Sequence, residues 1–188
     1  HTRSTYHHDR AKEDLEEYST SWIRPDYQKL GHDLSEALEE ASNEEDMQRF
    51  LAENKELLVR HLGGGHGRYV IPKPKLGSQY VPDFLIAEMS SIGIEWHGIE
   101  LEHPYGRLCN IDGQLSAPLN HAIQQIRDWR SWLTSNISYA RGAKSESGLG
   151  LVGIDGNIPA TILMGRRKEF PASFNVHRRQ IKDRENIE

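Results

Sequence analysis

Three acidic residues near the middle of the chain have the types and spacing of a metal site. Asp83 lies within residues 81–86, and Glu100 and Glu102 lie within residues 94–102. Carboxylate oxygens, together with water, are the ligands that Mg²⁺ and Mn²⁺ prefer. An ion of this kind makes a bound water more acidic, which is a way of activating water for hydrolysis.

A hairpin over residues 80–102 would bring these carboxylates together. With its tip centred after Ser91, Asp83 lies directly opposite Glu100, and such side chains have Cβ atoms about 5 Å apart. Glu102 shares the face of Glu100, because side chains alternate along a strand. The same register puts an apolar set on the opposite face, which predicts core: Phe84, Ile86, Ile99 and Leu101.

Two interpretations of this acidic cluster remain open from spacing alone. Facing carboxylates repel, and without neutralisation one of them would have a raised pKa. A divalent cation removes that penalty and favours the metal site. A solvent-exposed acidic edge needs no metal, because water screens the charges.

The surrounding pattern predicts an α/β sandwich with a mixed sheet. Residues 1–32 are polar and acidic, and we expect an N-terminal arm there with a short helix, followed by a domain over residues 33–188. Ser42-Asn43 offers an N-cap for a second helix that continues to Leu62. The remaining elements are expected at 68–72, 80–87 and 94–102 (strands), 115–133 (helix), and 149–154 and 158–164 (a hairpin around Asp155-Gly156).

Composition restricts the class of protein. The chain has 188 residues, a net charge of −5 and a single cysteine, Cys109, which excludes an internal disulfide and a cysteine-based zinc site. No apolar run is long enough for a membrane span and no secretion leader opens the chain, so we expect a cytoplasmic protein. The C-terminal part is basic and would face nucleic acid, or else form a solvated tail: Arg166, Arg167, Lys168, Arg178, Arg179, Lys182 and Arg184.

Residues 81–86 and 99–102 resemble the signature of the PD-(D/E)XK nucleases, in which Asp begins one strand and (D/E)-x-K lies on the next. A closer resemblance is to the nuclease domain of the Shedu antiphage-defence proteins. It is carried by segments 44–54, 82–86, 100–104, 122–129 and 162–166 in that order.

The resemblance implies a PD-(D/E)XK restriction-endonuclease-like core and a Mg²⁺-dependent DNA endonuclease that acts in phage defence as a homo-oligomer. Asp83 and Glu100 would bind Mg²⁺ (or Mn²⁺), with the Leu101 carbonyl as a further ligand, and the products would carry a 5′-phosphate and a 3′-hydroxyl. Glu102 replaces the usual lysine. It would ligate a second ion or accept a proton from the attacking water.

Two rival functions remain. The first is a nuclease-fold module that has lost catalysis at Glu102 and only binds nucleic acid or a protein. The second is a metal-dependent phosphodiesterase that acts on a nucleotide or on RNA.

Several further residues are candidates for supporting roles. Glu44 shares the inward helical face of Met47 and Leu51, where related nucleases keep an extra carboxylate, although an acid there also suits a helix N-terminus. Glu45 is the fallback if the helix phase differs by one residue. The resemblance implies that Gln125 points at the site, the alternative being a glutamine satisfied between helix and sheet.

The aromatic, basic and histidine candidates also have purely structural interpretations. Trp129 is expected in the core. Lys73 and Lys75 either contact phosphates or lie on a solvated edge strand, which the neighbouring prolines favour. His103 is a weak candidate for a general acid, whereas His97 and His121 are expected to be structural.

Overall fold

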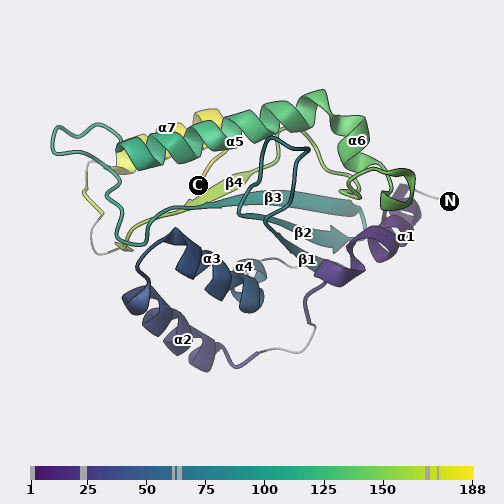
Figure 1. Cartoon of the computed structure of the whole chain (residues 1–188), viewed down its shortest axis with the longest axis horizontal. Helices are drawn as coiled ribbons and strands as arrows, with labels where there is room; N and C mark the ends of the chain where they lie inside the picture. Colours follow the sequence, from purple (N-terminus) through teal and green to yellow (C-terminus); the bar gives the residue numbers. More distant parts are fainter. Residues whose placement is uncertain (1–2, 22–24, 61, 63–64, 168–169, 173) are drawn as a thin grey trace.

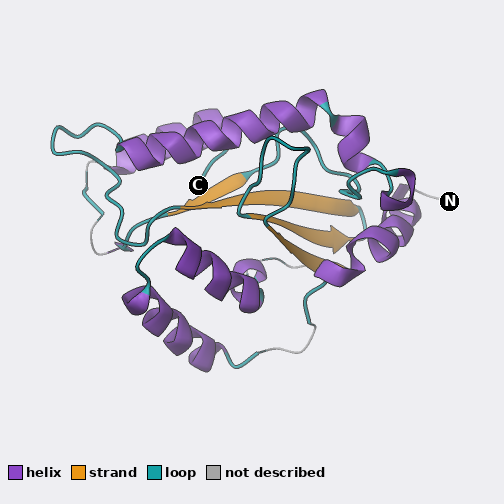
Figure 2. Ribbon diagram, in the orientation of Figure 1, coloured by secondary structure: helices purple, strands orange, loops and turns teal. Residues whose placement is uncertain are grey.

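The computed structural model describes residues 3–21, 25–60, 62, 65–167, 170–172 and 174–188. The strands are β1 (Gly67–Pro72), β2 (Phe84–Ser90), β3 (Gly93–Leu101) and β4 (Ala160–Leu163). The helices are α1 (Arg3–Leu15), α2 (Tyr27–Glu40), α3 (Glu44–Glu53), α4 (Glu56–Val59), α5 (Ala117–Ser135), α6 (Ile137–Arg141) and α7 (Phe174–Glu185), with 3₁₀ turns at Glu16–Tyr18 and Lys144–Glu146. Figures 1 and 2 show their arrangement.

One mixed sheet, in the order β1-β2-β3-β4, forms the centre of the domain. Strands β1, β2 and β3 are antiparallel neighbours, and β4 runs parallel to β3. A parallel pair needs a crossover, and α5 provides it on one face of the sheet, while α3 and α4 lie on the other (Figure 1). The fold is therefore mixed α/β with a four-stranded mixed sheet between helices, as the pattern of elements predicts.

The hairpin of β2 and β3 has the predicted register. Phe84 pairs with Ile99 and Ser90 pairs with Gly93, so the two-residue tip is the expected one. The strand begins at Phe84 and not at Tyr80. Pro82 has no N–H to offer a neighbouring strand, and Tyr80 pairs instead with Leu76.

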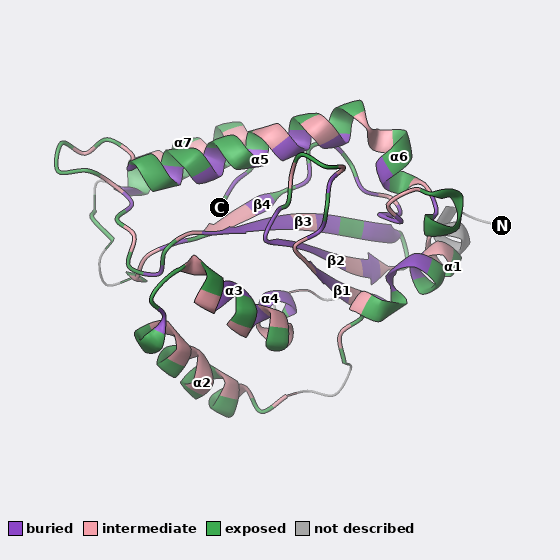
Figure 3. Cartoon of the chain, in the orientation of Figure 1, coloured by how far each residue is buried: buried purple, intermediate pink, exposed green. Residues whose placement is uncertain are grey.

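Each face of the sheet packs against its own hydrophobic core (Figure 3). The face predicted to be apolar meets α3 and α4 through Leu51, Leu58, Val59, Val70, Phe84, Ile86, Ile99 and Leu101. The opposite face packs against α5 with Leu85, Ala87, Trp96, Ile126, Trp129 and Leu133 among its buried residues. Burial on both faces holds the hairpin in one register, because a slip by one residue would exchange the two faces.

The second predicted helix is correct at its start and wrong at its end. Asn43 caps α3 by accepting a hydrogen bond from Asp46 N. However, α3 stops at Glu53, because Asn54 leaves the helical conformation and returns its side-chain amide to Phe50 O at 2.9 Å. A separate short helix, α4, follows, so a continuous helix to Leu62 is not formed.

The expected strand over 149–154 is also wrong. Gly150 and Gly153 have φ of +72° and +71°, which bends the backbone away from an extended path. The amide of Leu151 bonds to Ala140 O at 2.9 Å, so the segment packs against α6 and forms no hairpin with β4. Asp155 accepts a hydrogen bond from the amide of Gly156 within this loop.

The last part of the basic C-terminal stretch is helical: Arg178, Arg179, Lys182 and Arg184 lie in α7, and their side chains are exposed. Helix α7 joins α5 through two hydrogen bonds from Arg127 to Glu185, while Arg130 donates to the backbone oxygens of Glu185 and Asn186. Ile187 then forms a parallel bridge with Ala160 of β4. Lys168 lies outside the described residues. Contact of the basic residues with nucleic acid stays a prediction.

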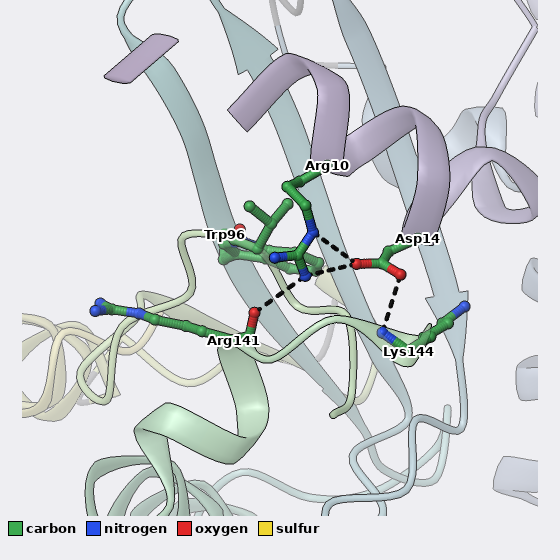
Figure 4. Close-up of polar contacts among 6 residues, drawn as sticks. Arg10, Asp14, Trp96, Arg141 and Lys144 are labelled. Atoms are coloured by element: carbon green, nitrogen blue, oxygen red, sulfur yellow. Dashed lines mark hydrogen bonds and ion pairs between the residues drawn. The ribbon is translucent and has the colours of Figure 1, made fainter. Parts of the chain in front are cut away.

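Helix α1 packs on the α5-side core and carries a buried carboxylate that joins it to the 3₁₀ turn at Lys144–Glu146. Ala11 and Leu15 are buried in the α5-side core, and Asp14 between them is only 5% exposed. Asp14 accepts hydrogen bonds from the Arg10 guanidinium and from the backbone N–H of Lys144 (Figure 4). The predicted arm thus packs on the domain. Helix α2 crosses residue 32, and the division of the chain at that point remains a prediction.

Replacing Asp14 by Ala is expected to lower the free energy of unfolding by about 2 kcal/mol. The reason is that hydrogen bonds to a charged group contribute about 1.5–3 kcal/mol, and the variant loses those that Asp14 accepts from Arg10 and from the Lys144 N–H. Urea unfolding of the full chain measures the change. Glu13→Ala, at an exposed position of the same helix, is the matched control, and equal losses in the two variants would contradict the role of Asp14.

Within the described residues, no helix combines the length and the apolar character that crossing a membrane requires.

Candidate functional site

Asp83 and Glu100 lie at the end of the sheet where β2 begins and β3 finishes. This end is near the start of α3 and the first turns of α5, at the left in Figure 1. Continuing the β2–β3 register by one residue places the two residues opposite each other. Both are almost fully buried, at 4% and 3% exposure. Two buried acids that face each other are costly in a fold, so this pair is a functional candidate.

The carboxylate of Asp83 is held by the two strands on either side of it. One oxygen, Oδ2, accepts a hydrogen bond from the Leu101 N–H of β3 at 2.8 Å. The other, Oδ1, lies 2.6 Å from Nζ of Lys73, which follows β1. These contacts fix the direction of the carboxylate and provide one positive charge beside it.

The carboxylate of Glu100 is held from above by α5. Trp129 donates its indole N–H to Glu100 Oε1 at 2.8 Å. The indole reaches this depth because residue 98 of β3 is glycine: a Cβ there would lie 2.7 Å from the Trp129 ring. Burial, together with the negative charge of Asp83, raises the pKa of Glu100 to about 8.

Glu44 and Glu102 extend the acidic cluster towards solvent. Both are half-buried. Burial and the charge of Asp83 raise the pKa of Glu44, and burial and the charge of Glu44 raise the pKa of Glu102. His121 of α5 acts in the opposite direction on both groups. The predicted acidic residues therefore interact electrostatically, with Asp83 and Glu100 at the buried centre.

The buried pair fits a Mg²⁺ ion, whereas the full predicted triad is not assembled. Mg²⁺ is usually held in proteins by one or two carboxylates, with water and substrate phosphate completing its shell. Asp83 and Glu100 supply such a pair, and a cation would offset the repulsion that raises the pKa of Glu100. In the part of the chain that the structure describes, no three His, Cys, Asp or Glu side chains are placed to hold one ion. Ligation by Glu102 remains a prediction.

Lys73, expected on a solvated edge strand, is the residue whose position differs most from what the sequence favours. It does follow an edge strand, but its ammonium turns inward to Asp83 and lies 3.9 Å from Glu45. Its φ of +47° is unusual for a residue with a side chain and aims the chain at the site. Partial burial lowers the pKa of Lys73, but the hydrogen bond to Asp83 and its charge outweigh this effect, and the pKa is raised. The sequence gives no sign of this contact, because the alternation of Lys with Pro indicates only that the segment lies at an edge of the sheet.

Helix α5 carries three residues four positions apart, His121, Gln125 and Trp129, and they differ in their relation to the acidic residues. Trp129 is buried in the core, as predicted, and also contacts Glu100. Gln125 is exposed, so its predicted contact with the site stays a prediction. His121, expected to be structural, is close enough to Glu44 and Glu102 to affect both. Its spacing of four from Gln125 is the signal that would have identified it.

His103 and His97 have structural contacts. His103 Nε2 lies 3.0 Å from Ser42 O, and its Nδ1 accepts the N–H of Tyr105 at 3.1 Å. His103 thereby links the end of β3 to the start of α3. His97 lies 2.8 Å from the Thr161 hydroxyl between β3 and β4.

Fold and site together define a mixed α/β domain with a buried acidic pair at the end of its central hairpin. A model of the Shedu protein SduA C-terminal family matches residues 41–188 of the chain. Because this match covers well over half of the sequence, the chain belongs to that family, and membership indicates a role in antiphage defence. No curated protein sequence matches the chain.

Proposed function

We propose that this domain is a metal-dependent DNA endonuclease with a PD-(D/E)XK core, acting in antiphage defence. The observation that carries the proposal is the pair Asp83 and Glu100, both almost fully buried and facing each other at the end of the β2–β3 hairpin. Each carboxylate is held by a specific N–H donor, so the structure preserves an arrangement that costs stability.

The order of the elements also supports the proposed core. Helix α3, strands β1, β2 and β3, helix α5 and strand β4 follow one another along the chain. The resemblance to PD-(D/E)XK nucleases implies this order, with the acidic residues on the second and third strands.

In the proposed mechanism, Asp83 and Glu100 would hold Mg²⁺ at the buried end of the hairpin. When bound there, Mg²⁺ would polarise the scissile phosphate and increase the acidity of a water ligand. Glu102, half-buried on the same face as Glu100, orients the attacking water and accepts its proton. Lys73 provides the positive charge that Glu102 cannot, and contacts the phosphate. Trp129 and the Leu101 N–H keep the two carboxylates in place.

Plasmid nicking by the purified full chain tests the proposal. We expect cleavage of supercoiled DNA with Mg²⁺ or Mn²⁺, no cleavage in EDTA, and a loss of at least about 100-fold in Glu100→Gln, since metal catalysis contributes several kcal/mol. Glu95→Gln, at an exposed position of the same strand, should cleave like the wild type. Cleavage that persists in EDTA or in Glu100→Gln would reject the proposed site.

A second candidate function is a DNA-binding module without catalysis. The ion pair between Lys73 and Asp83 favours it, because the ammonium occupies the carboxylate oxygen that a metal ion would use. Binding of DNA by the wild type without cleavage in either metal would support this alternative.

A further inference from the structure

A basic cavity lies at the end of the sheet where the parallel strands β3 and β4 finish. It has a volume of about 400 Å³ and is formed by the loop after β3 and the loop after β4. Arg107 and Arg166 line it together with Tyr105, and no carboxylate contributes to its wall. The cavity therefore has the charge that suits an anion and not a cation.

The two loops that form this cavity are held together through their backbones. His103 O accepts hydrogen bonds from the amides of Gly106 and Gly165 at 2.8 and 3.3 Å. Gly165 has a φ of +66°, and a Cβ at this position would lie 2.7 Å from Gly106 O. Only glycine permits this approach, so the position of the cavity relative to the end of β3 is set by the fold.

Arg166 is held in place and still has a donor to offer. Its Nη2 donates to Leu38 O at 2.7 Å and to the Tyr105 hydroxyl at 3.1 Å, and its guanidinium lies 4.9 Å from the centre of the Tyr105 ring. Its Nε is buried and has no hydrogen-bond partner among the described residues. Because this nitrogen is enclosed by the protein, an anion in the cavity would meet the outer nitrogens of the Arg166 guanidinium.

Arg107 provides the second positive charge. Its side chain is exposed, and within the described ranges it has neither a hydrogen bond nor an ion pair. A guanidinium with free donors in a fork matches the oxygens of a phosphate. The two arginines therefore differ in role: Arg166 is fixed in the wall of the cavity, and Arg107 is free to move towards a ligand.

We propose that the Arg107–Arg166 cavity binds a backbone phosphate of the DNA strand that is cleaved at Asp83 and Glu100. This inference rests on the proposed function and adds a substrate-positioning contact to it. Tyr105 and Arg107 follow Glu102 by only three and five residues along the chain, so the cavity and the acidic site share one loop. Contacts of this kind fix the register of a nucleic acid without reading its sequence.

DNA binding in EDTA, where the proposed cleavage cannot occur, tests the inference. The probe is a fluorescein-labelled DNA duplex, and its affinity is measured by anisotropy over a range of NaCl concentrations. For Arg107→Gln we expect about tenfold weaker binding and a salt dependence reduced by about one released counterion. Arg166→Gln should behave similarly, and Arg167→Gln, an exposed neighbour that does not line the cavity, should bind like the wild type.

Each outcome separates the inference from the function on which it rests. Thermal unfolding checks that Arg166→Gln is folded. If it is not, Arg107→Gln serves, because Arg107 makes no hydrogen bond or ion pair with the described part of the chain. Unchanged affinity in Arg107→Gln, with a wild type that binds and nicks DNA, would overturn the inference alone. A wild type that neither binds nor nicks DNA would overturn the proposed function. In that case, stabilisation of the wild type but not of Arg107→Gln by inorganic phosphate would retain an anion site without a DNA role.

Discussion

Glu100→Gln is expected to unfold at a higher urea concentration than the wild type at pH 9, although the two proteins differ little at pH 5. The pKa of Glu100 is raised from 4.5 to about 8 by burial and by the charge of Asp83. Its protonated form therefore stabilises the native state, and this contribution is complete below about pH 4.5 and lost as the pH rises through about 8. Glutamine resembles the protonated acid at every pH and keeps an acceptor for the Trp129 N–H.

The expected difference in unfolding free energy between the two proteins at pH 9 is on the order of 3–5 kcal/mol. Urea unfolding in EDTA at intervals of one pH unit measures this difference. The contributions of the other titrating groups to the unfolding free energy cancel, because both proteins carry those groups. Glu95→Gln, exposed on the same strand, should show no such difference. Addition of Mg²⁺ at pH 8.5 should stabilise the wild type and not Glu100→Gln, because only the wild type has both carboxylates. A constant difference from pH 5 to pH 9 would contradict the prediction.

Lys73→Gln is expected to reduce DNA cleavage on the order of 100-fold without weakening the binding of Mn²⁺. Loss of one positioned donor for a developing negative charge typically has an effect of this size. Metal binding should be unchanged or tighter, because Lys73 Nζ lies 2.6 Å from an Asp83 oxygen and competes for it. Nicking rates and calorimetric titration with Mn²⁺ measure the two properties separately.

Lys75→Gln is the control for this variant, because Lys75 is exposed on the same segment. A parallel fall in cleavage and in Mn²⁺ affinity would show that Lys73 only holds Asp83 in position. Cleavage at the wild-type rate would show that it is a counter-ion without a part in the reaction.

The central hairpin could be predicted from the sequence because two independent patterns agree there. A tip centred after Ser91 places Phe84, Ile86, Ile99 and Leu101 on one face, and the same register places Asp83 opposite Glu100 on the other. Alternation has a period of two, so it specifies face and pairing at once. The Asn43 cap and the class of the fold follow from equally local signals.

Elements that depend on distant partners could not be predicted in this way. The helix after Asn43 stops at Glu53 because Asn54 leaves the helical conformation, and the run 149–154 is bent by two glycines and packed against α6. Helix α7 has few apolar residues, and its place depends on the contacts of Arg127 and Arg130 of α5 with its end.

The sequence alone determined which acids could form the site, since residue type and strand alternation are local properties. Only the tertiary structure decided what surrounds them. Lys73 enters from a neighbouring strand, Trp129 descends from a helix on one face of the sheet, and Gly98 makes the space for its ring. Lys73 and Trp129 are 10 and 29 positions away from the carboxylates that they contact. Their contacts with the carboxylates depend on how the helices and strands pack. A buried charge needs polar partners, and the packing determines which residues lie close enough to be those partners.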